Sequence, residues 1–481
     1  MNAPAAAASE SFLYRDLAER LAHSVATGAF RIGDRLPSVR ELAAQERVSI
    51  ATAVAAYRDL EARRIIEARP KSGFFVAPRR NQLPEPASSA RRQRRCSLDG
   101  VSRLTLEILE AAGNPDVVPL GAACPSPELM FPAAEVRRVT AARLRSDPGL
   151  ATEYRMGPGF APLRRAIAQQ AFTFGCTLDP DEIVVTNGCM EALTLGLRAI
   201  TKPGDTVAME SPAYFGLLQI AESLGLKVLE IPTSPRHGMS VEALDLATRR
   251  PGAIAAVVVT PTISNPLGSV MPDAAKRRLV ALMAERDIPV IEDDVYGDLH
   301  FGERRPRALR SWDATGNVLL CSSFTKTVAP GLRVGWIAPG RWRDAVALLK
   351  FTTSIATSEL NQAVITDLIA SGGLDRHLRR MRAVFRLQVQ RMTDAIERHF
   401  PEGTRITRPA GGFVLWVELP PSIDTLALFW KALERGVSIA PGTMFSASGG
   451  CTHHLRLSCG MPFSDTIERA IRTLGELAAT D

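Results

Sequence analysis

Hydrophobic positions in the first part of the chain recur with the spacing of helices. Between residues 12 and 26 apolar side chains follow one another every three or four positions, which predicts an amphipathic helix. The segment Ser38-Val39-Arg40-Glu41 has the spacing of a capping box, so we expect a second helix from there to about residue 45. Ser49 is the expected N-cap of a third helix over 50–63.

Two short apolar runs follow the third helix. Residues 65–68 and 74–76 flank a basic turn that contains Gly73, and this pattern predicts a two-stranded wing. Short helices joined by a tight turn are typical of a helix-turn-helix module, whose second helix enters the major groove of DNA. We therefore expect a DNA-binding domain over 11–78.

The pattern changes beyond this domain. Within residues 79–98, Pro84 and Pro86 are followed by Ser88-Ser89 and then by a cluster of four arginines, which predicts a linker. The four arginines are Arg91, Arg92, Arg94 and Arg95. They either contact DNA or keep the linker solvated, and solvation is the favoured interpretation. From 99 to 481, apolar runs of strand length alternate with helical patterns, which predicts an α/β domain with a mainly parallel sheet. We expect its large part over about 120–340 and its small part over about 341–481.

Composition limits the class of protein. With 481 residues, 46% hydrophobic and 23% charged, the chain is long enough for several domains with sizeable cores. No apolar run approaches the ~18 residues of a membrane span, and the first residues lack the features of a signal peptide, so we expect a cytoplasmic protein without a membrane contact. Seven cysteines without C-x-x-C spacing indicate reduced thiols and argue against a disulfide framework or a metal site.

The positive charge is unevenly distributed. The chain has 58 basic and 51 acidic side chains, a net charge of +7. Residues 1–98 contain 17 basic and 10 acidic side chains, and residues 99–481 contain 41 of each. A locally basic domain is the electrostatic footprint of a phosphate-backbone partner. A merely soluble basic face is the alternative, and charge alone does not exclude it.

Candidate chemistry centres on Lys326, which follows an apolar strand and precedes Arg333 on a loop bent by glycine and proline. Buried lysines become amine nucleophiles toward carbonyl groups, and an arginine fork pairs with phosphate oxygens. Pyridoxal 5'-phosphate (PLP) needs both partners. A solvated loop with one ordinary lysine is the alternative, so the interpretation depends on partners elsewhere in the chain.

Four such partners stand at expected strand ends or in buried runs. Asp293 ends a buried strand, where a carboxylate is costly unless it is paired, and a pyridinium N–H would pair it. Gly188 lies between a strand and a helix, a turn that suits phosphate. Tyr214 follows another strand end, and Arg456 among apolar neighbours requires a carboxylate. Taken singly, each of them is more often structural.

The first domain resembles the winged helix of GntR-type regulators. The matching segments are Gly33-Asp34-Arg35-Leu36-Pro37-Ser38-Val39-Arg40-Glu41-Leu42-Ala43, Val48-Ser49, Tyr57, Leu60-Glu61 and Ser72-Gly73, together with Gly28. The resemblance implies phosphate contacts by Arg35 and Arg40, a groove position for Ser49 and Thr52, and close approach of the wing backbone at Gly73. Ile50 and Ala51 depart from the pattern, because an arginine is common after Ser49, and a guanine-reading candidate is thereby lost.

The second domain resembles fold type I aminotransferases over nearly 380 residues. The resemblance implies that Lys326 bonds the PLP aldehyde, Arg456 holds the α-carboxylate of an amino acid, and Tyr154 reaches across a dimer interface. The other cofactor-binding residues that it implies are Gly188, Cys189, Met190, Tyr214, Asn265, Asp293, Tyr296, Ser323, Thr325 and Arg333. Cys189 and Met190 replace the polar pair that is usual in the family.

Together the two domains resemble the MocR family of bacterial transcriptional regulators. This implies a winged helix-turn-helix joined to a fold type I PLP-dependent transferase domain with a smaller C-terminal α+β subdomain. It also implies a homodimer that binds a double-stranded DNA operator and senses an amino acid or amine effector. A working aminotransferase with a secondary DNA-binding domain is the main alternative, since every residue that the chemistry needs is present. A nonspecific DNA-associated PLP protein is a third, weaker one.

Overall fold

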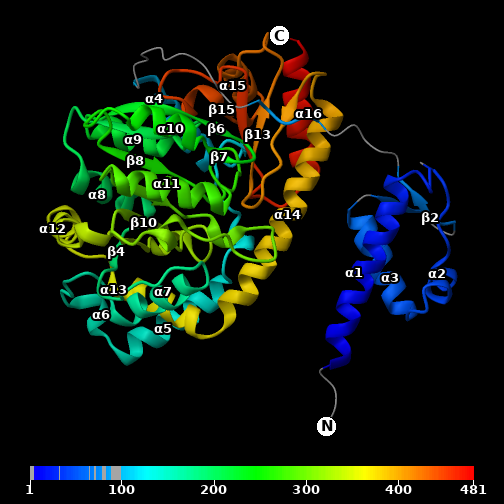
Figure 1. Ribbon diagram of the computed structural model, residues 1–481, viewed down its shortest axis with the longest axis horizontal. Coiled ribbons are helices and arrows are strands. Elements are labelled where there is room, and N and C mark those ends of the chain that lie inside the picture. Colours follow the sequence, from blue (N-terminus) through cyan, green and yellow to red (C-terminus); the bar gives the residue numbers. More distant parts are fainter. Residues whose placement is uncertain are drawn as a thin grey trace. The chain divides into compact units, whose positions relative to one another are not determined.

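The computed structural model describes residues 5–31, 33–63, 65–69, 72–77, 83–87 and 99–480. The chain divides into two compact units, Met1–Gln82 and Leu83–Asp481, which we describe separately (Figure 1).

The first unit is a three-helix module with a two-stranded wing. Its elements are α1 (Ala5–Ala26), α2 (Val39–Gln45), α3 (Ile50–Ala62), β1 (Ile66–Arg69) and β2 (Gly73–Val76). The strands β1 and β2 pair in antiparallel fashion, as the wing pattern predicts. Helix α1 begins seven residues earlier than the apolar periodicity indicates. The added turns include a run of alanines, which have the highest helix propensity but no amphipathic pattern.

Local capping fixes where α2 and α3 begin. Ser38 Oγ accepts from the Glu41 backbone N–H at 3.3 Å, and Glu41 Oε2 accepts from the Ser38 N–H at 2.7 Å. Ser49 Oγ accepts from the Thr52 N–H at 3.0 Å. The capping box and the N-cap that the sequence predicts are therefore confirmed.

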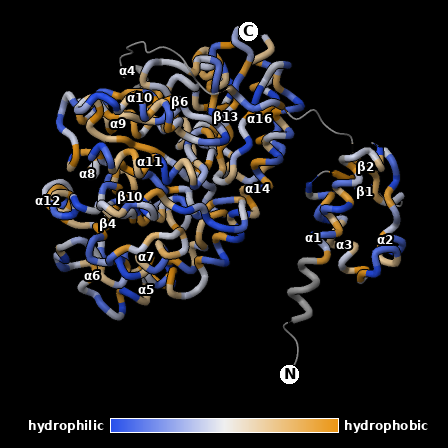
Figure 2. The backbone as a smooth tube through the Cα atoms, viewed as in Figure 1, coloured by the Kyte–Doolittle hydropathy of each residue, from blue (hydrophilic) through white to orange (hydrophobic). Residues whose placement is uncertain are grey.

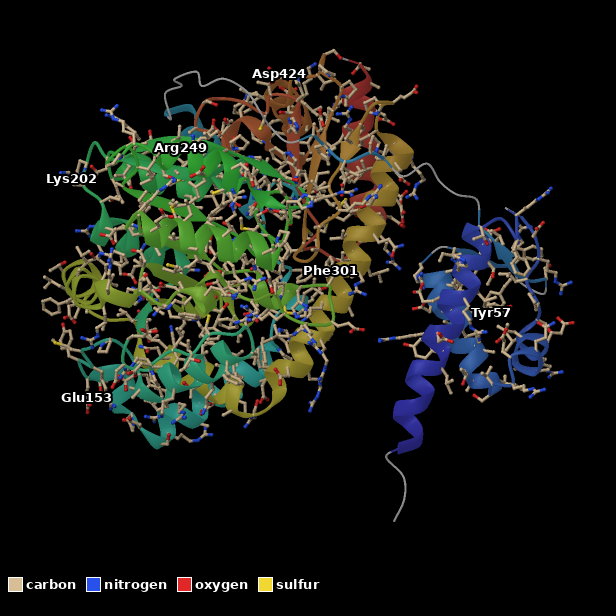
Figure 3. The ribbon with its side chains drawn as sticks, viewed as in Figure 1. Tyr57, Glu153, Lys202, Arg249, Phe301 and Asp424 are labelled. Atoms are coloured by element: carbon tan, nitrogen blue, oxygen red, sulfur yellow. The ribbon has the colours of Figure 1, made fainter. Side chains whose placement is uncertain are left out.

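Tyr57 of α3 connects the parts of this unit (Figure 3). Its ring has no exposed surface and lies 4.5 Å from the ring of Phe74, centroid to centroid. Its hydroxyl donates to the Pro37 carbonyl at 2.6 Å, which ties α3 to the segment before α2. One side chain thus holds the third helix, the preceding loop and the wing in one core.

The second unit is built on an eight-stranded sheet in the order β4-β11-β10-β9-β8-β5-β6-β7. The strands are β4 (Val184–Thr186), β5 (Thr206–Ser211), β6 (Lys227–Ser234), β7 (Gly238–Met239), β8 (Ala256–Val259), β9 (Val290–Asp293), β10 (Val318–Ser323) and β11 (Gly335–Ala338). The strands β5, β6, β8, β9 and β10 are parallel to their neighbours in this set, and β11 runs antiparallel between β10 and β4. The prediction of a mainly parallel sheet is confirmed.

Helices cover both faces of this sheet (Figure 1). On one face are α8 (Cys189–Ile200), α9 (Phe215–Ser223) and α12 (Arg343–Ser354), and on the other are α10 (Val241–Thr248) and α11 (Asp273–Glu285). Successive strand residues point to opposite faces, so Val207 and Met209 join the first core and Ala208 joins the second. Peripheral helices such as α5 (Ala133–Ser146) alternate between hydrophilic and hydrophobic colours in Figure 2.

A smaller antiparallel sheet, β12-β13-β16-β15, forms the C-terminal part. Its strands are β12 (Arg405–Ile406), β13 (Val414–Glu418), β15 (Ala440–Pro441) and β16 (His454–Ser458), and its helices are α14 (Gly373–His399), α15 (Thr425–Glu434) and α16 (Asp465–Ala479). Nearby, α4 (Asp99–Gly113) precedes β3 (Val118–Pro119), which pairs with β14 (Val437–Ser438). Helix α13 (Glu359–Ala370) packs on α5, α6 (Gly149–Thr152) and α7 (Ala161–Phe172).

These contacts differ from the division that we expect near residue 341. Helices α12 and α13 pack on the helices of the large part, although both follow that boundary. The pairing of β3 with β14 links a segment before residue 120 to the C-terminal part. Packing across distant segments, which periodicity along the chain does not record, sets this division.

Part of the predicted linker belongs to the second unit. The Leu83 N–H donates to Glu397 Oε1 of α14 at 3.3 Å, and the Ile406 N–H of β12 donates to the Pro84 carbonyl at 2.9 Å. Glu85 pairs with Arg236. Residues 83–87 are thus held on this unit, whereas Arg91, Arg92, Arg94 and Arg95 lie outside the described residues.

Among the described residues, no helix has both the length and the apolar character needed to cross a membrane. Six cysteines lie in the described ranges, and each is a free thiol.

The capping box gives a first testable expectation. Replacing Ser38 with alanine removes the acceptor for the Glu41 N–H, so α2 should lose about 1 kcal/mol of stability. Hydrogen exchange of the α2 amides in the full-length protein, followed by mass spectrometry, should become roughly fivefold faster. Ser38→Thr keeps the oxygen and should exchange nearly as slowly as the wild type. Unchanged exchange in Ser38→Ala would show that the cap does not stabilise α2.

Candidate functional site

The carboxyl ends of parallel strands gather the predicted residues of the second unit at one edge of the sheet. Asp293 ends β9 and Ser323 ends β10. Ser323 pairs with Gly335 of β11, which pairs in turn with Thr186 at the end of β4. Three strands therefore deliver Asp293, Ser323 and the turn after Thr186 to the same place.

The turn into α8 forms an anion site. Gly188 is the N-cap with φ +88°, a conformation that favours glycine, and the helix behind it directs free N–H groups and a positive dipole end outward. A Cβ on Gly188 would lie 2.7 Å from Arg333 Nη2, so only glycine leaves room for that guanidinium. The hydroxyls of Ser323 and Thr325 lie 2.6 Å apart. These donors together suit a phosphate group.

Cys189 and Met190 are the first residues of α8. Met190 is 37% exposed, and Cys189 is half-buried. Their backbone N–H groups belong to the positive end of the helix, so this placement agrees with a phosphate contact through the backbone.

A buried charge cluster holds this turn in place. Glu191 accepts from the Asn187 N–H at 2.6 Å, from Lys350 Nζ at 2.7 Å and from Ser354 Oγ at 2.6 Å. Lys350 of α12 is 2% exposed. This cluster could not be predicted from the sequence, because neither Glu191 nor Lys350 lies in a pattern that distinguishes it from surface charges.

Lys326 is half-buried, and its Nζ donates to the Ala123 carbonyl at 2.7 Å. Burial lowers the pKa of Lys326, and the positive charges of Arg456 and Arg333 lower it further, while Cys124 opposes the shift. A larger fraction of this amine is therefore uncharged at neutral pH than is usual for lysine. That is the form in which an amine attacks a carbonyl group.

Asp293 is 4% exposed. Its Oδ1 accepts from the Cys189 thiol at 3.5 Å and from the Val295 N–H at 3.3 Å. Burial raises the pKa of Asp293 to about 6, and the bond from Cys189 limits the rise. The carboxyl group is thus mainly ionised at neutral pH and able to accept a further charged donor.

Arg456 is 1% exposed and lies at the middle of β16. Its Nη1 donates to Asn265 Oδ1 at 3.2 Å, and its Nη2 donates to the Gly121 carbonyl. The guanidinium carbon lies 5.1 Å from the Phe445 ring centroid. Within the described part of the chain, its Nε has no hydrogen-bond partner. A buried guanidinium held by neutral oxygens can still accept a carboxylate.

Two tyrosines lie near the same charges. Burial raises the pKa of Tyr214 to about 12, partly offset by Arg456, and burial also raises the pKa of Tyr296. The charges of Asp293 and Arg456 act on both phenols. One site therefore holds Tyr214, Asp293, Tyr296 and Arg456, which come from three segments far apart in sequence.

The segment before η1 (Pro127–Leu129) contributes groups that the sequence analysis missed. Gly121 and Ala123 supply the carbonyls that Arg456 and Lys326 use. Cys124 is exposed and close enough to Lys326 and Arg456 to affect the pKa of both. Backbone carbonyls have no residue signature, so no sequence signal could have identified this segment.

Tyr154 is not part of this group. It is 85% exposed, and among the described residues no hydrogen bond or ion pair joins it to the Lys326 site. A side chain so exposed in one chain is compatible with a role at an interface, which is the role that the sequence resemblance implies.

The five predicted DNA-contacting residues differ in their exposure to solvent. Arg35, Arg40 and Ser49 are exposed, and Gly73 at the start of β2 has φ +104°. Thr52 is only 6% exposed, and its hydroxyl lies 2.8 Å from Ser49 Oγ. Thr52 therefore packs inward and orients Ser49 instead of presenting its own side chain at the surface. The periodicity of α3 brings its fourth helical neighbour, Ala56, to the same buried face.

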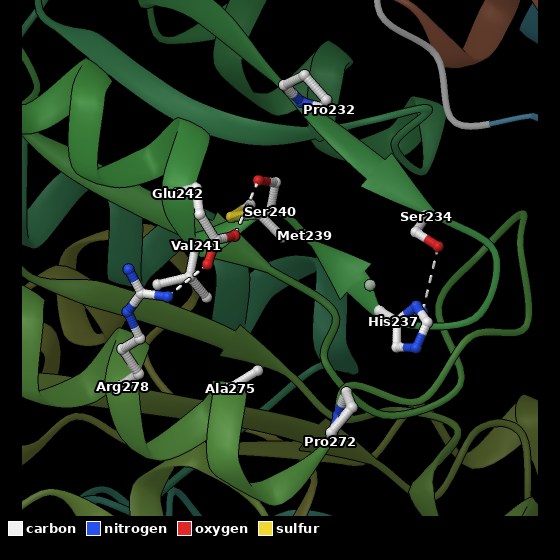
Figure 4. A pocket seen from close by; sticks show the side chains of 11 residues that line it. Pro232, Ser234, His237, Met239, Ser240, Val241, Glu242, Pro272, Ala275 and Arg278 are labelled. Carbon is white, nitrogen blue, oxygen red and sulfur yellow. Dashed lines mark hydrogen bonds and ion pairs between the residues drawn. The ribbon is translucent and has the colours of Figure 1, made fainter.

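A cavity of about 350 Å³ lies elsewhere, at the β7 edge of the large sheet (Figure 4). Its polar lining includes Ser234, His237 and Ser240, and Arg278 pairs there with Glu242. The Lys326 loop follows β10 on the opposite side of β9, β8, β5 and β6, so this cavity is separate from the site described above.

Glu210 near the end of β5 is a buried carboxyl that the sequence analysis did not single out. It is 5% exposed, and its Oε2 accepts from the Thr260 N–H at 2.9 Å. Its Oε1 has no partner within the described residues. Burial raises the pKa of Glu210 to about 8, and the negative charge of Asp293 adds to the rise. Glu210 is therefore mainly protonated at neutral pH.

Comparison with known sequences and structures places these features in a family. The family model "Aminotransferase class I and II" matches residues 126–474, and the model "Bacterial regulatory proteins, gntR family" matches residues 13–76. The HTH-type transcriptional regulator YjiR of Escherichia coli is 40% identical over 466 residues, which cover 96% of this chain and 98% of that one. The chain belongs to the MocR family. It is a helix-turn-helix regulator fused to an aminotransferase-like domain.

Other relatives of this MocR protein agree with that architecture. The HTH-type transcriptional regulator TauR of Rhodobacter capsulatus is 28% identical over 460 residues, covering 90% of this chain and 89% of that one. The crystal structure of LysN, an α-aminoadipate aminotransferase of Thermus thermophilus, superposes with a TM-score of 0.72 at 31% identity. The superposition covers 78% of this chain and 94% of the LysN chain. The predicted family and fold class are confirmed.

The protonated Glu210 predicts a pH-dependent effect on stability. In the unfolded chain this carboxyl ionises near its ordinary pKa of 4.5, whereas in the fold it retains its proton to about pH 8. Its folded pKa is raised, so stability falls as pH rises through this window. Glu210→Gln should remove that loss and raise the free energy of unfolding at pH 8.5 by a few kcal/mol, at ~1.4 kcal/mol per pKa unit.

Denaturant unfolding of the second unit at pH 5 and pH 8.5 checks this expectation. The gain of Glu210→Gln over the wild type should be much larger at the higher pH. The exposed Glu434→Gln, a matched change of charge, should show no such trend. Equal effects of Glu210→Gln at both values would mean that the carboxyl is ionised in the fold.

Proposed function

We propose that this MocR protein binds PLP at the Lys326 site, recognises an amino acid there, and changes its binding to a double-stranded DNA operator in response. The observation that carries the proposal is the pairing of two features at one site. Lys326 is an amine with a lowered pKa, and the nearby charge of Arg456 contributes to that shift. Arg456 is a buried guanidinium whose Nε has no hydrogen-bond partner among the described residues. An amino acid presents the groups that fit them, a nitrogen attached to carbon and a carboxylate.

The residues fit PLP as well. The glycine-lined turn at Gly188, the Arg333 guanidinium, and the Ser323 and Thr325 hydroxyls suit its phosphate. Asp293, ionised at neutral pH, suits its pyridinium N–H. The solved structures that resemble this domain include a kynurenine aminotransferase of Pyrococcus horikoshii described in complex with PMP, at 29% identity and a TM-score of 0.73.

Each residue has a defined task in this proposal. When bound, PLP supplies an aldehyde and an electron-withdrawing ring. Lys326 would offer its amine to that aldehyde, and Asp293 would keep the ring nitrogen protonated. Tyr214 would cover the face of the ring, while Asn265 and Tyr296 would hydrogen-bond the hydroxyl oxygen of PLP. Arg456 holds the carboxylate of the incoming amino acid.

Arg456 also links ligand binding to the arrangement of the protein, because its hydrogen bonds join segments of the small and large sheets. It extends from β16 of the small sheet to Asn265 after β8 of the large sheet and to the Gly121 carbonyl. A carboxylate on this guanidinium competes for the N–H groups that now join those segments. Such a ligand shifts the protein between two arrangements by the difference in its affinity for them.

We propose a homodimer as the functional unit, cytoplasmic like its DNA target. Tyr154 is 85% exposed and lies where the aminotransferase resemblance implies a residue reaching into the partner's site. Two winged units in one dimer fit an operator with two half-sites.

A working aminotransferase is the second candidate. Lys326, Asp293 and Arg456 would serve turnover as well as sensing. The 2-aminoadipate transaminase of Thermus thermophilus is 33% identical over 375 residues, covering 77% of this chain and 92% of that enzyme. Steady conversion of an amino donor and a 2-oxo acid, without sequence-specific DNA binding, would favour this candidate. The excess positive charge of residues 1–98 favours regulation.

Lys326→Ala tests the cofactor. The variant should lose the visible absorbance of bound PLP because the covalent partner of the aldehyde is gone. Lys202→Ala, on the surface of the second unit, should keep it (Figure 3). If Lys326→Ala stays coloured to the same extent, Lys326 is not the attachment site.

Arg456→Gln tests recognition of the amino acid. PLP absorbance should remain, but the concentration of amino acid needed for a spectral change should rise roughly tenfold to hundredfold, since a lost charged hydrogen bond is worth ~1.5–3 kcal/mol. Operator affinity, measured in parallel, should no longer respond to the amino acid. A spectral change in the wild type with unaltered DNA binding would contradict sensing and leave PLP binding intact.

Arg40→Ala tests the DNA face. Loss of one phosphate contact should weaken binding to all sequences and reduce the slope of log affinity against log salt by about 1. Arg277→Ala removes an exposed charge from the second unit and should leave that slope unchanged. An unchanged slope in Arg40→Ala would exclude this arginine from the interface. Salt-dependent binding without sequence preference would identify a nonspecific DNA-associated protein.

A further inference from the structure

The first turn of α3 exposes an isoleucine. Ile50, the first residue of the helix, is 58% exposed, and the next residue, Ala51, is exposed too. Ser49 caps the helix, and Thr52 packs inward. The accessible end of α3 therefore presents an apolar side chain where a DNA-reading helix usually presents a hydrogen-bonding one.

Packing within the unit does not explain this isoleucine. The core that holds α3 consists of residues on its other face, such as Ala53, Ala56 and Tyr57, and Ile50 is not among them. Exposing an isoleucine at a helix end gains nothing for folding. Arg40 and Arg47 are exposed nearby in sequence, so the apolar end lies on a segment with positive charge suited to phosphates.

Only one group on the base edges of the major groove is complementary to an alkyl side chain. Guanine, cytosine and adenine present hydrogen-bond donors and acceptors there, whereas thymine also presents its C5-methyl group. Isoleucine can neither donate nor accept a hydrogen bond. We propose that Ile50 reads a thymine methyl, so that each operator half-site carries an A·T pair facing the start of α3. This inference rests on the operator binding proposed above.

Replacing thymine with uracil tests the contact, because this change removes only the methyl group. The operator is first selected from random duplexes with the full-length protein, and each selected thymine is then replaced singly by uracil. At one position per half-site the wild type should lose affinity roughly fourfold, the value of one buried methyl-sized group. In Ile50→Ala the same replacement should have little effect.

Two further variants sharpen the assignment. Leu13→Ala shortens another exposed apolar side chain, 49% exposed on α1, and should keep the wild-type sensitivity to uracil. Ile50→Arg should shift the selected base at that position from thymine to guanine, because arginine pairs bidentately with guanine O6 and N7.

The outcomes separate the two levels of the proposal. If the wild type binds every uracil-containing operator as tightly as the original, or if Ile50→Ala remains equally sensitive, Ile50 does not read a thymine methyl, although operator binding stands. If the selection enriches no sequence, the operator proposal fails and this inference fails with it.

Discussion

A buried arginine constrains the arrangement of the second unit. Arg456 is 1% exposed, and removing a guanidinium from water costs several kcal/mol unless its N–H groups find acceptors. Asn265 and the Gly121 carbonyl supply two of them from segments more than 140 residues apart, and Nε remains without a partner among the described residues. The fold thus holds a positive charge that is only partly compensated, which is the condition for binding a small carboxylate.

The parallel sheet brings the other residues of the site together at one edge. Because β4, β9 and β10 end at one edge, Gly188, Asp293 and Lys326 reach the same place from turns that have little else in common. Burial shifts the pKa values of Lys326 and Asp293 in opposite directions. Burial lowers the pKa of Lys326, which increases the uncharged fraction of its amine, and raises the pKa of Asp293 to about 6, so that carboxyl group stays mainly ionised at neutral pH. Glu210 beside them stays protonated and adds no negative charge.

In the winged unit, the residues of the small core are separate from the exposed residues at the start of α3. Tyr57 joins α3, the loop before α2 and the wing by one hydrogen bond and one ring contact. This frees the start of α3 from any packing task, and Ile50 is exposed there. Single substitutions at this exposed turn should therefore leave the fold intact, because the core residues of α3 lie on its other face.

Features that depend on near neighbours or on the order of motifs could be predicted from the amino-acid sequence. The capping box of Ser38 and Glu41, the N-cap at Ser49 and the wing are local features, and the succession of a GntR-like and an aminotransferase-like pattern indicated the fold and the family. The folded chain alone reveals that Thr52 packs inward, that residues 83–87 are held on the second unit, and that Gly121 and Ala123 face Arg456 and Lys326. The burial of a side chain and its backbone hydrogen-bond acceptors depend on contacts between distant segments. Neither can be inferred from the identity of the residue or of its neighbours in sequence.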